Sequence, residues 1–105
     1  MENEIKKLCE KITKESQDYL IKRNLGCEVN LKNAISHYHI AKKYTRVDIG
    51  DNGRYMVENE TGNIYGIKAY GVIHRGHFFG NLNNIDNYFW GSYRAILKTG
   101  VENVK

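Results

Sequence analysis

The middle of the chain alternates between apolar and polar residues in three stretches, and two glycine-containing segments separate them. The alternating stretches cover residues 44–49, 55–57 and 64–69. Between them lie Gly-Asp-Asn-Gly at 50–53 and Asn-Glu-Thr-Gly at 59–62, which supply the positive φ angles that hairpin turns need. A period of two places successive side chains on opposite faces of a strand. The pattern therefore predicts a three-stranded antiparallel meander that has one face to bury.

Residues 3–24 have the apolar spacing of an amphipathic helix. We expect Asn3 to cap its start and Gly26 to end it in the left-handed conformation. The helix offers one apolar stripe and the meander one face to cover, so the two should pack on each other. The expected fold is α+β, with the N-terminal helix inside residues 1–26 and a small antiparallel meander of three to four strands inside residues 44–97. The apolar stripe is formed by Ile5, Leu8, Ile12, Ser16, Tyr19 and Leu20.

Two other segments are less regular. Residues 27–31 alternate as a short strand would, whereas the apolar residues of 31–41 fall on one side of a helix, and we prefer the helix. Residues 81–87 fit one helical turn, and the aromatic and aliphatic residues of 88–97 are typical of a buried closing strand. From Thr99 onward we expect the chain to fray.

Length and composition indicate a soluble single domain. The chain has 105 residues, of which 41% are hydrophobic and 27% charged, so we expect one domain over residues 1–105. No apolar run approaches the roughly 18 residues that a membrane span requires. The start, Met-Glu-Asn-Glu, is acidic where a signal peptide is basic. We therefore expect a cytoplasmic protein without a membrane partner.

The cysteines and the net charge limit the chemistry further. Cys9 and Cys27 form no motif and no disulfide framework, so we expect reduced thiols that serve as small apolar core residues. The formal net charge of +4 permits binding to nucleic acid or to an acidic protein face without requiring either. It is opposite in sign to the charge of a DNA mimic.

The histidines raise the question of a metal site. His37 and His39 share a face on a strand but lie about 200° apart on a helix, so the preferred helix over 31–41 separates them. His74 and His77 have a helical ligand spacing, yet Gly76 lies between them. Without a cysteine cluster or an H-E-x-x-H helix, we expect solvated or hydrogen-bonded histidines, with no metal and no cofactor.

Catalytic motifs are nearly absent from the sequence. Arg75-Gly76-His77 resembles part of the Asp-Arg-Gly-His motif of ββα-metal nucleases, but position 74 is His where that motif begins with Asp. One of Asn83, Asn84 and Asn87 would then have to hold the metal. The serines lack a G-x-S-x-G context, and no glycine run has the P-loop form. A small metal-dependent nuclease is therefore the third candidate, behind two kinds of binding protein.

The strongest functional pattern is a mixture of glycine, aromatic and cationic residues after the third strand. Glycines at 66, 71, 76 and 80 interrupt this region, which predicts an exposed loop. Such a mixture suits base stacking with phosphate contacts, or the aromatic and arginine anchors of protein interfaces. The alternative is that Phe78 and Phe79 fill the core while the glycines only turn corners. The candidate binding residues are Tyr70, His74, Arg75, His77, Phe78 and Phe79, extended by the basic residues Lys42, Lys43 and Arg46.

Three blocks within residues 43–95 resemble small uncharacterised proteins of phages and mobile elements. The blocks are Tyr-Thr-Arg-Val-Asp-Ile-Gly at 44–50, Gly-Arg-Tyr-Met-Val at 53–57 and Thr-Gly-Asn-Ile-Tyr-Gly-Ile-Lys-Ala-Tyr-Gly at 61–71. They match the core KYTRVDxG…GRYMV…TGxIYGIKAYG of that group. The group has no established catalytic residues, so none is transferred to this chain.

The resemblance implies a non-catalytic, stoichiometric binding protein of the host cytosol. Its expected partner is a host protein or nucleoprotein complex, and its expected role is to inhibit host defence, in the manner of an anti-CRISPR protein, or to inhibit nucleic-acid machinery. The first alternative is a nucleic-acid-binding module that binds DNA or RNA.

Overall fold

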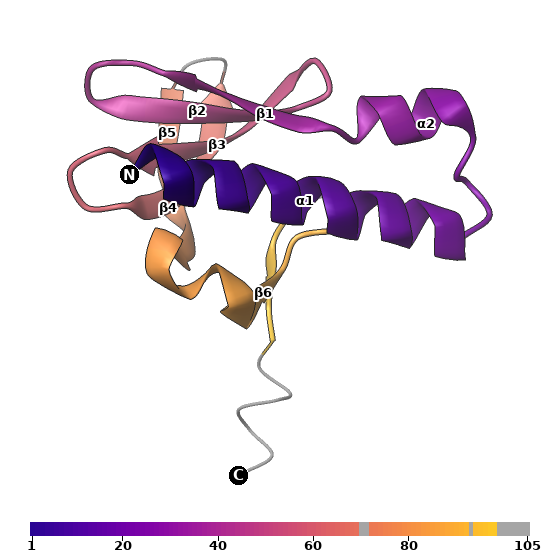
Figure 1. The fold of residues 1–105 in the computed structure, drawn as a ribbon. Coiled ribbons are helices and arrows are strands. Elements are labelled where there is room, and N and C mark those ends of the chain that lie inside the picture. The colour runs from indigo at the N-terminus through magenta and orange to yellow at the C-terminus, as the bar shows by residue number, and fades with distance from the viewer. Residues whose placement is uncertain (70–71, 93, 99–105) are drawn as a thin grey trace, which may run out of the picture.

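A long N-terminal helix lies against a five-stranded antiparallel sheet in the computed structural model, which describes residues 1–69, 72–92 and 94–98 (Figure 1). The expected α+β arrangement is confirmed, but the sheet has five strands where three to four were expected. Its strand order is β1-β2-β3-β4-β5, and each strand is antiparallel to its neighbours. The elements are α1 (Glu2–Lys22), α2 (Glu28–Asn33), β1 (Ser36–Ile40), β2 (Tyr44–Ile49), β3 (Asn52–Glu58), β4 (Asn63–Ala69), β5 (Val72–Asn81), the 3₁₀ helix η1 (Leu82–Asn87), β6 (Tyr88–Phe89) and β7 (Ile96–Leu97).

Helix α1 buries the stripe that its sequence predicts, but its ends differ from the expectation. Its buried residues Ile5, Leu8, Cys9, Ile12 and Ser16 recur at steps of three and four, which places them on one side of the helix. Met1 occupies the N-cap position without a side-chain hydrogen bond. The expected cap, residue 3, lies inside the helix, so that prediction was wrong.

The C-terminal end of α1 forms a Schellman motif around Asn24 and not around Gly26. Asn24 has a φ of 59°, its N–H donates to Ile21 C=O, and the N–H of Leu25 donates to Leu20 C=O at 2.8 Å. These two bonds satisfy carbonyls that the helix leaves unpaired, and asparagine tolerates the left-handed conformation. The helix therefore ends two residues earlier than expected.

The expected helix over 31–41 was wrong. Residues 28–33 form the short helix α2, and residues 36–40 form strand β1 at the edge of the sheet. β1 pairs with β2 from Ser36 opposite Ile49 to Ile40 opposite Thr45. Pairing and burial against the sheet outweigh the local helical spacing, because strand formation depends strongly on tertiary context.

The C-terminal segment fills the remaining side of the core. The predicted helical turn at 81–87 is confirmed as η1, which Asn81 caps by accepting from Asn83 N–H. A single closing strand over 88–97 is not formed, because β6 and β7 pair with each other as a separate two-stranded sheet. Tyr93 and the tail from Thr99 lie outside the described residues.

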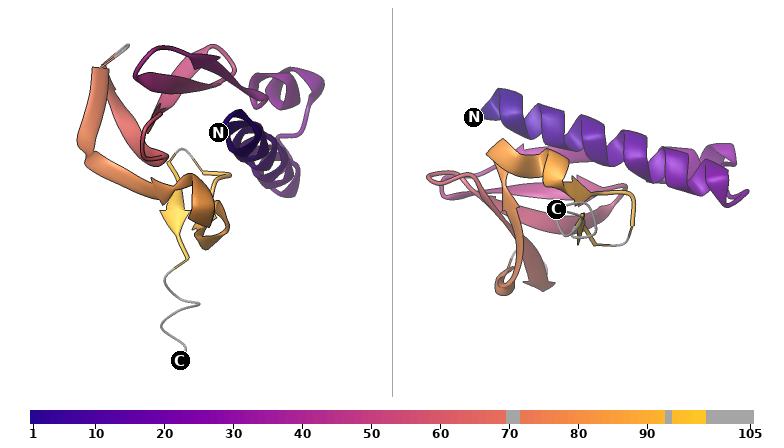
Figure 2. Two further views of the ribbon diagram at one scale, coloured as in Figure 1. Left: turned by 60° about the vertical axis from the view of Figure 1, so that its left-hand side comes forward. Right: turned by 90° about the horizontal axis from the view of Figure 1, so that it is seen from below.

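Trp90 joins this segment to both the helix and the sheet. Its side chain is fully buried and meets the ring of Tyr55 edge-on, with 5.3 Å between centroids. Its indole N–H donates to Ile85 C=O at 2.9 Å, and its backbone N–H donates to the carboxylate of Glu15 in α1 at 2.7 Å. Figure 2 shows α1, the curved sheet and η1 arranged around this common interior.

Two further expectations concern cysteine and the membrane. Both thiols are free; Cys9 is buried as expected, whereas Cys27 is exposed, contrary to its expected place in the core. Within residues 1–69, 72–92 and 94–98, no helix has the length and apolar character that a membrane crossing requires.

Candidate binding surface

The sheet has a second face, turned away from α1, and this face carries the most exposed site residues. Register defines it, because directly opposed residues in an antiparallel sheet share a face. Arg46 lies opposite Met56, Met56 opposite Tyr65, and Tyr65 opposite Phe78. The intervening residues, such as Val47 and Val57, point into the core with α1. We call the set that contains Arg46, Tyr65 and Phe78 the outer sheet face.

A bulge in β5 separates the candidate residues onto the two faces. Tyr65 pairs with Phe78, but the next residue of β4, Gly66, pairs with His74. Residues 75–77 of β5 therefore have no partner in β4, and a bulge of this kind redirects side chains. The expected loop over this region was wrong, since residues 72–81 form one ten-residue strand.

Arg75 lies over the outer sheet face and is held there by residues from three other strands. Its guanidinium is 5.1 Å from the ring centroid of Tyr65 in β4 and 5.9 Å from that of Tyr44 in β2. Nη2 donates to the Tyr44 hydroxyl at 2.6 Å and lies 3.5 Å from the carboxylate of Glu58 in β3. Tyr44 and Glu58 raise the pKa of Arg75, so the cation is retained.

Phe78 extends this arrangement along the strand. Phe78 as a whole residue is 52% exposed, and its ring lies 5.6 Å from that of Tyr65 in a tilted arrangement. The side chain of Arg75 is 52% exposed. Arg75 and Phe78 thus each present about half of their surface to solvent, and both lie against the ring of Tyr65. We call Tyr44, Glu58, Tyr65, Arg75 and Phe78 the Arg75 surface.

The other three basic candidates border the Arg75 surface. Lys42 and Lys43 are exposed in the turn between β1 and β2 and line a hollow of about 330 Å³ together with Glu58. Arg46 lies on the outer sheet face, two residues from Tyr44, and donates to the carboxylate of Asp48 at 2.9 Å. The predicted extension of the basic surface is therefore consistent with the fold.

The candidates His74, His77 and Phe79 lie on the core side of the bulge in β5. His74 and His77 stack with 4.0 Å between ring centroids and 13° between planes. A Cβ on Gly66 would lie 3.0 Å from that of His77, so glycine lets His77 pack over β4. Partial burial lowers the pKa of His77, with His74 and Arg94 acting in the same direction.

Phe79 belongs to the core, whereas Phe78 does not. Phe79 packs edge-on against the buried ring of Tyr55 at 5.2 Å. The alternative in which both phenylalanines fill the core therefore holds for Phe79 alone. Tyr70, the remaining candidate of this group, lies outside the described residues.

The four histidines lie in β1 and β5, and the asparagines of the nuclease hypothesis lie in η1. In the described ranges, no three His, Cys, Asp or Glu side chains gather as a metal site. His37 and His39 do share a face, since β1 is a strand, and His37 lies 3.8 Å from the carboxylate of Asp48. Asn84, one of the asparagines of the nuclease hypothesis, accepts a hydrogen bond from Asn81 N–H through its side-chain oxygen, as part of the η1 cap.

Sequence reasoning missed Tyr44, Glu58 and Tyr65 as site residues. Tyr44 and Tyr65 belong to predicted strands and Glu58 directly follows a third, and none of them is part of a catalytic or binding motif. The turn at 59–62 places Glu58 and Tyr65 on one face, but a bulge beside Val47 and Asp48 shifts the register between β2 and β3, so the turns alone do not add Tyr44. Arg75 could not be added either, because its position depends on the bulge in β5.

Comparisons with known proteins found no match to this chain among family models, curated proteins or solved structures.

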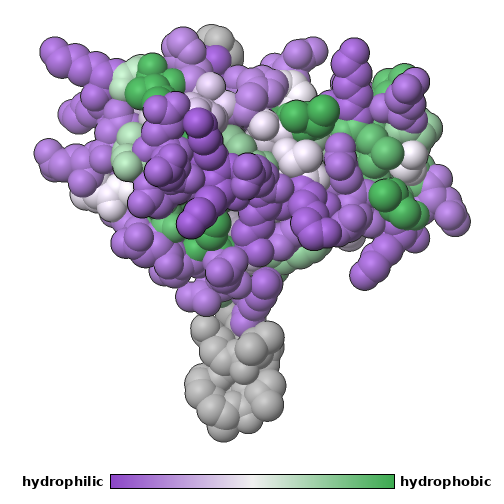
Figure 3. Space-filling view, in the orientation of Figure 1, coloured by the Kyte–Doolittle hydropathy of each residue, from purple (hydrophilic) through white to green (hydrophobic). Residues whose placement is uncertain are grey.

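The side of the molecule that carries α1 is mainly hydrophilic, with apolar side chains gathered where α1 meets α2 (Figure 3). Ile21, Leu25 and Val29 are the exposed apolar residues of that region.

Proposed function

We propose that this chain is a non-catalytic binding protein that engages its partner through the Arg75 surface. The observation that carries the proposal is the position of the Arg75 guanidinium, which two tyrosine rings and one carboxylate hold at an exposed face. Arginine and tyrosine are enriched among residues that dominate binding energy. An anchor fixed before binding also loses less conformational entropy when the partner arrives.

The chemistry of the Arg75 surface indicates what its partner offers. A guanidinium has five N–H donors in a planar fork, and the Tyr44 hydroxyl accepts from one nitrogen only. The fork matches the oxygen atoms of a carboxylate or a phosphate. Phe78 adds an apolar contact beside it. The expected partner therefore presents an acidic group next to an apolar or aromatic side chain.

The resemblance to small phage and mobile-element proteins supports a role for this binding. We propose that the chain inhibits a host defence complex, as an anti-CRISPR-like protein, or inhibits nucleic-acid machinery in the host cytosol. The net charge of +4 favours an acidic face of the host protein or nucleoprotein complex, because complementary charge speeds encounter and selects orientation.

A pull-down from bacterial lysate tests the proposal. The tagged chain is compared with the double variant Arg75→Ala, Phe78→Ala, and each capture is repeated after nuclease treatment. A matched control is the double variant Arg23→Ala, Ile96→Ala. Arg23 also lies over a tyrosine, 5.4 Å from the Tyr19 centroid, and Ile96 is 53% exposed.

We expect wild type and control to retain a stoichiometric protein partner after nuclease treatment, and the Arg75 double variant to lose it. Equal retention by all three proteins would show that the partner binds elsewhere. Loss of the partner from every nuclease-treated sample would show that nucleic acid bridges the two proteins.

The alternative is a nucleic-acid-binding module, and the exposed rings on an open sheet face favour it. Tyr65 and Phe78 lie in contact on the outer sheet face, and aromatic rings on a sheet surface can stack with unpaired bases. Lys42, Lys43 and Arg46 would supply phosphate contacts. Affinity for a single-stranded oligonucleotide should then fall steeply with added salt. Absence of a gel shift at low salt would remove this alternative.

A further inference from the structure

Strand β1 is an edge strand whose own residues give no protection against a further strand, although helix α1 lies beside it. It pairs with β2 on one side, and its sequence Ser-His-Tyr-His-Ile contains no lysine, no arginine and no proline. Natural edge strands are commonly protected by such residues or by bulges. The opposite edge, β5, has the bulge described above. β1 is therefore the regular edge of the sheet, and α1 bonds its backbone at Ser36.

Two hydrogen bonds at the ends of β1 determine which of its backbone groups point outward. Gly50 N–H donates to Ile35 C=O, and Ala41 N–H donates to Tyr44 C=O. Hydrogen-bonded pairs alternate along an antiparallel ladder, so residues 35, 37, 39 and 41 face β2. The N–H and C=O groups of residues 36, 38 and 40 consequently face away from the sheet.

Only one of these outward groups is bonded within residues 1–69, 72–92 and 94–98. Ser36 N–H donates to the hydroxyl of Thr13 in α1 at 2.8 Å. In those ranges, Ser36 C=O and the N–H and C=O groups of Tyr38 and Ile40 make no hydrogen bond. Five backbone groups in a row are thus available to another strand.

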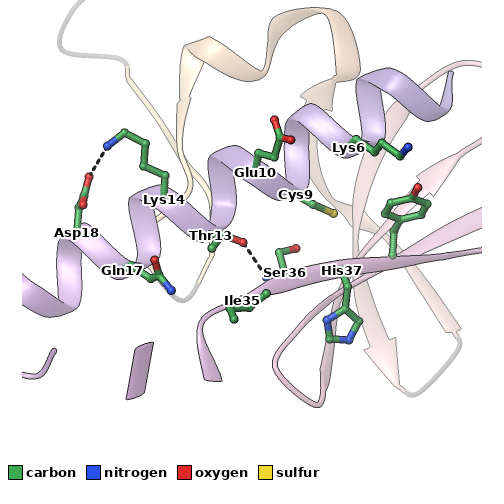
Figure 4. Close-up of a pocket in the computed structure, with 11 residues that line it drawn as sticks. Lys6, Cys9, Glu10, Thr13, Lys14, Gln17, Asp18, Ile35, Ser36 and His37 are labelled. Atoms are coloured by element: carbon green, nitrogen blue, oxygen red, sulfur yellow. Dashed lines mark hydrogen bonds and ion pairs between the residues drawn. The ribbon is translucent and has the colours of Figure 1, made fainter. Parts of the chain in front are cut away.

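A groove of about 700 Å³ lies between α1 and this edge (Figure 4). Cys9 and Thr13 of α1 line one wall, and Ile35, Ser36 and Tyr38 line the other. The charged lining residues are Lys6, Glu10, Lys14 and Asp18, two of each sign, and Lys14 pairs with Asp18 at 3.1 Å. The groove therefore combines a free backbone edge, apolar walls and balanced charge.

We propose that this groove binds an extended peptide segment of a partner protein, which adds a sixth strand beside β1. Strand addition to a free edge gives affinity through backbone hydrogen bonds, while alternate side chains of the peptide give specificity. The peptide has a small or apolar side chain directed between Cys9 and Ile35 and requires no net charge. This site is separate from the Arg75 surface, which lies on the outer sheet face.

A second copy of the chain is a poorer occupant than a peptide. The outward edge of its own β1 is already bonded at Ser36 to its own α1. An incoming β1 would bring that helix into the space where this α1 lies, because α1 packs beside the edge in both copies. A single extended segment brings no second helix and can lie in the groove between α1 and β1.

Panning a random octapeptide display library on the immobilised full chain tests the proposal. Selected octapeptides are synthesised and titrated by fluorescence anisotropy against three proteins. Ile40→Pro removes an outward N–H while sparing the bonds to β2, because proline is tolerated where an edge strand faces solvent. Ile40→Thr is the matched control, since it keeps the N–H and the branched side chain. The Arg75→Ala, Phe78→Ala variant reports on the other surface.

We expect Ile40→Pro to weaken octapeptide binding at least tenfold while Ile40→Thr and the Arg75 double variant stay within twofold. Methylating alternate backbone nitrogens of the octapeptide should cause a similar loss with the wild-type chain, which makes the test independent of whether Ile40→Pro folds. Tyr38 and Ile40 amides should become protected from hydrogen exchange on binding. Failure to select any binder, or binders that tolerate both Ile40→Pro and N-methylation, would overturn the proposal.

Discussion

The guanidinium of Arg75 donates a hydrogen bond of 2.6 Å to the hydroxyl of Tyr44, a residue 31 positions earlier in the chain. The two residues belong to β5 and β2, and two strands lie between these in the sheet. Arg75 therefore extends across the outer sheet face, and its position depends on the register of four strands. Binding through Arg75 should be sensitive to each residue that fixes it.

Removing the Tyr44 hydroxyl tests this dependence. Tyr44→Phe keeps the ring under Arg75 but removes its acceptor, so we expect affinity for the captured partner to fall by about 0.5–1.5 kcal/mol, the usual net worth of one hydrogen bond. Titration calorimetry measures the loss. Tyr19→Phe is the control, because it removes the acceptor that Arg23 uses at 2.9 Å. An equal loss in both variants would contradict the role of Tyr44.

Tyr55 provides a test of the core. Its fully buried hydroxyl accepts from Ala95 N–H at 2.9 Å, and burial raises its pKa to about 12. Tyr55→Phe leaves that N–H unpaired, so we expect a loss of about 1–3 kcal/mol in the free energy of unfolding. Urea denaturation measures it. Tyr65→Phe, on the half-exposed outer sheet face, should change stability by less than about 0.5 kcal/mol.

His77 should make stability depend on pH. The pKa of His77 is lower in the fold than in the unfolded chain, because partial burial, His74 and Arg94 disfavour its charged form. As pH falls through about 6.5, the unfolded chain takes up the proton first. We therefore expect the melting temperature to fall between pH 7.5 and pH 5.

Two variants assign this pH dependence to the histidine site. His77→Gln should flatten the profile, and Arg94→Ala should reduce its slope, because removing a neighbouring cation brings the pKa of His77 closer to its usual value. Arg23→Ala serves as a control for the loss of one positive charge. A profile that keeps its slope in His77→Gln would assign the dependence to another group.

The two thiols should react at very different rates. Cys27 is exposed, while Cys9 is 6% exposed and burial raises the pKa of its thiol. The thiolate is the reactive form, so a thiol reagent should modify Cys27 quickly and Cys9 only on unfolding. Mass spectrometry of the partly labelled chain checks the site. Fast labelling of Cys9 in the native protein would contradict the packing of α1 on the sheet.

The parts of the fold that follow from local patterns could be predicted from the sequence. The stripe on α1 and the turns at Gly50 and Gly62 were predicted correctly, and both glycines have positive φ angles, 60° and 79°. In these segments, local spacing and tertiary packing agree. Strand β1 was missed because its helical spacing is overridden by pairing with β2, which the sequence of 36–40 alone does not reveal.

The candidate site could be predicted only in part, because tertiary structure again decides where some of its residues lie. Arg75 and Phe78 were identified from their residue types, and both are exposed. His77 and Phe79 were assigned to the same loop, but the bulge in β5 turns them toward the core. A bulge changes which face a residue occupies, and no residue count within 72–81 fixes where it occurs. Sequence alone therefore could not separate the two groups.

The hydrogen bond between Trp90 N–H and the Glu15 carboxylate joins residues 75 positions apart. Helix α1 is translated before the elements that it packs against, and Trp90 is translated after all five strands of the main sheet. The native packing of the apolar stripe on α1 must accordingly wait until residue 90 has been translated. Shortening the chain before Trp90 should yield an aggregating product and not a smaller version of the same domain.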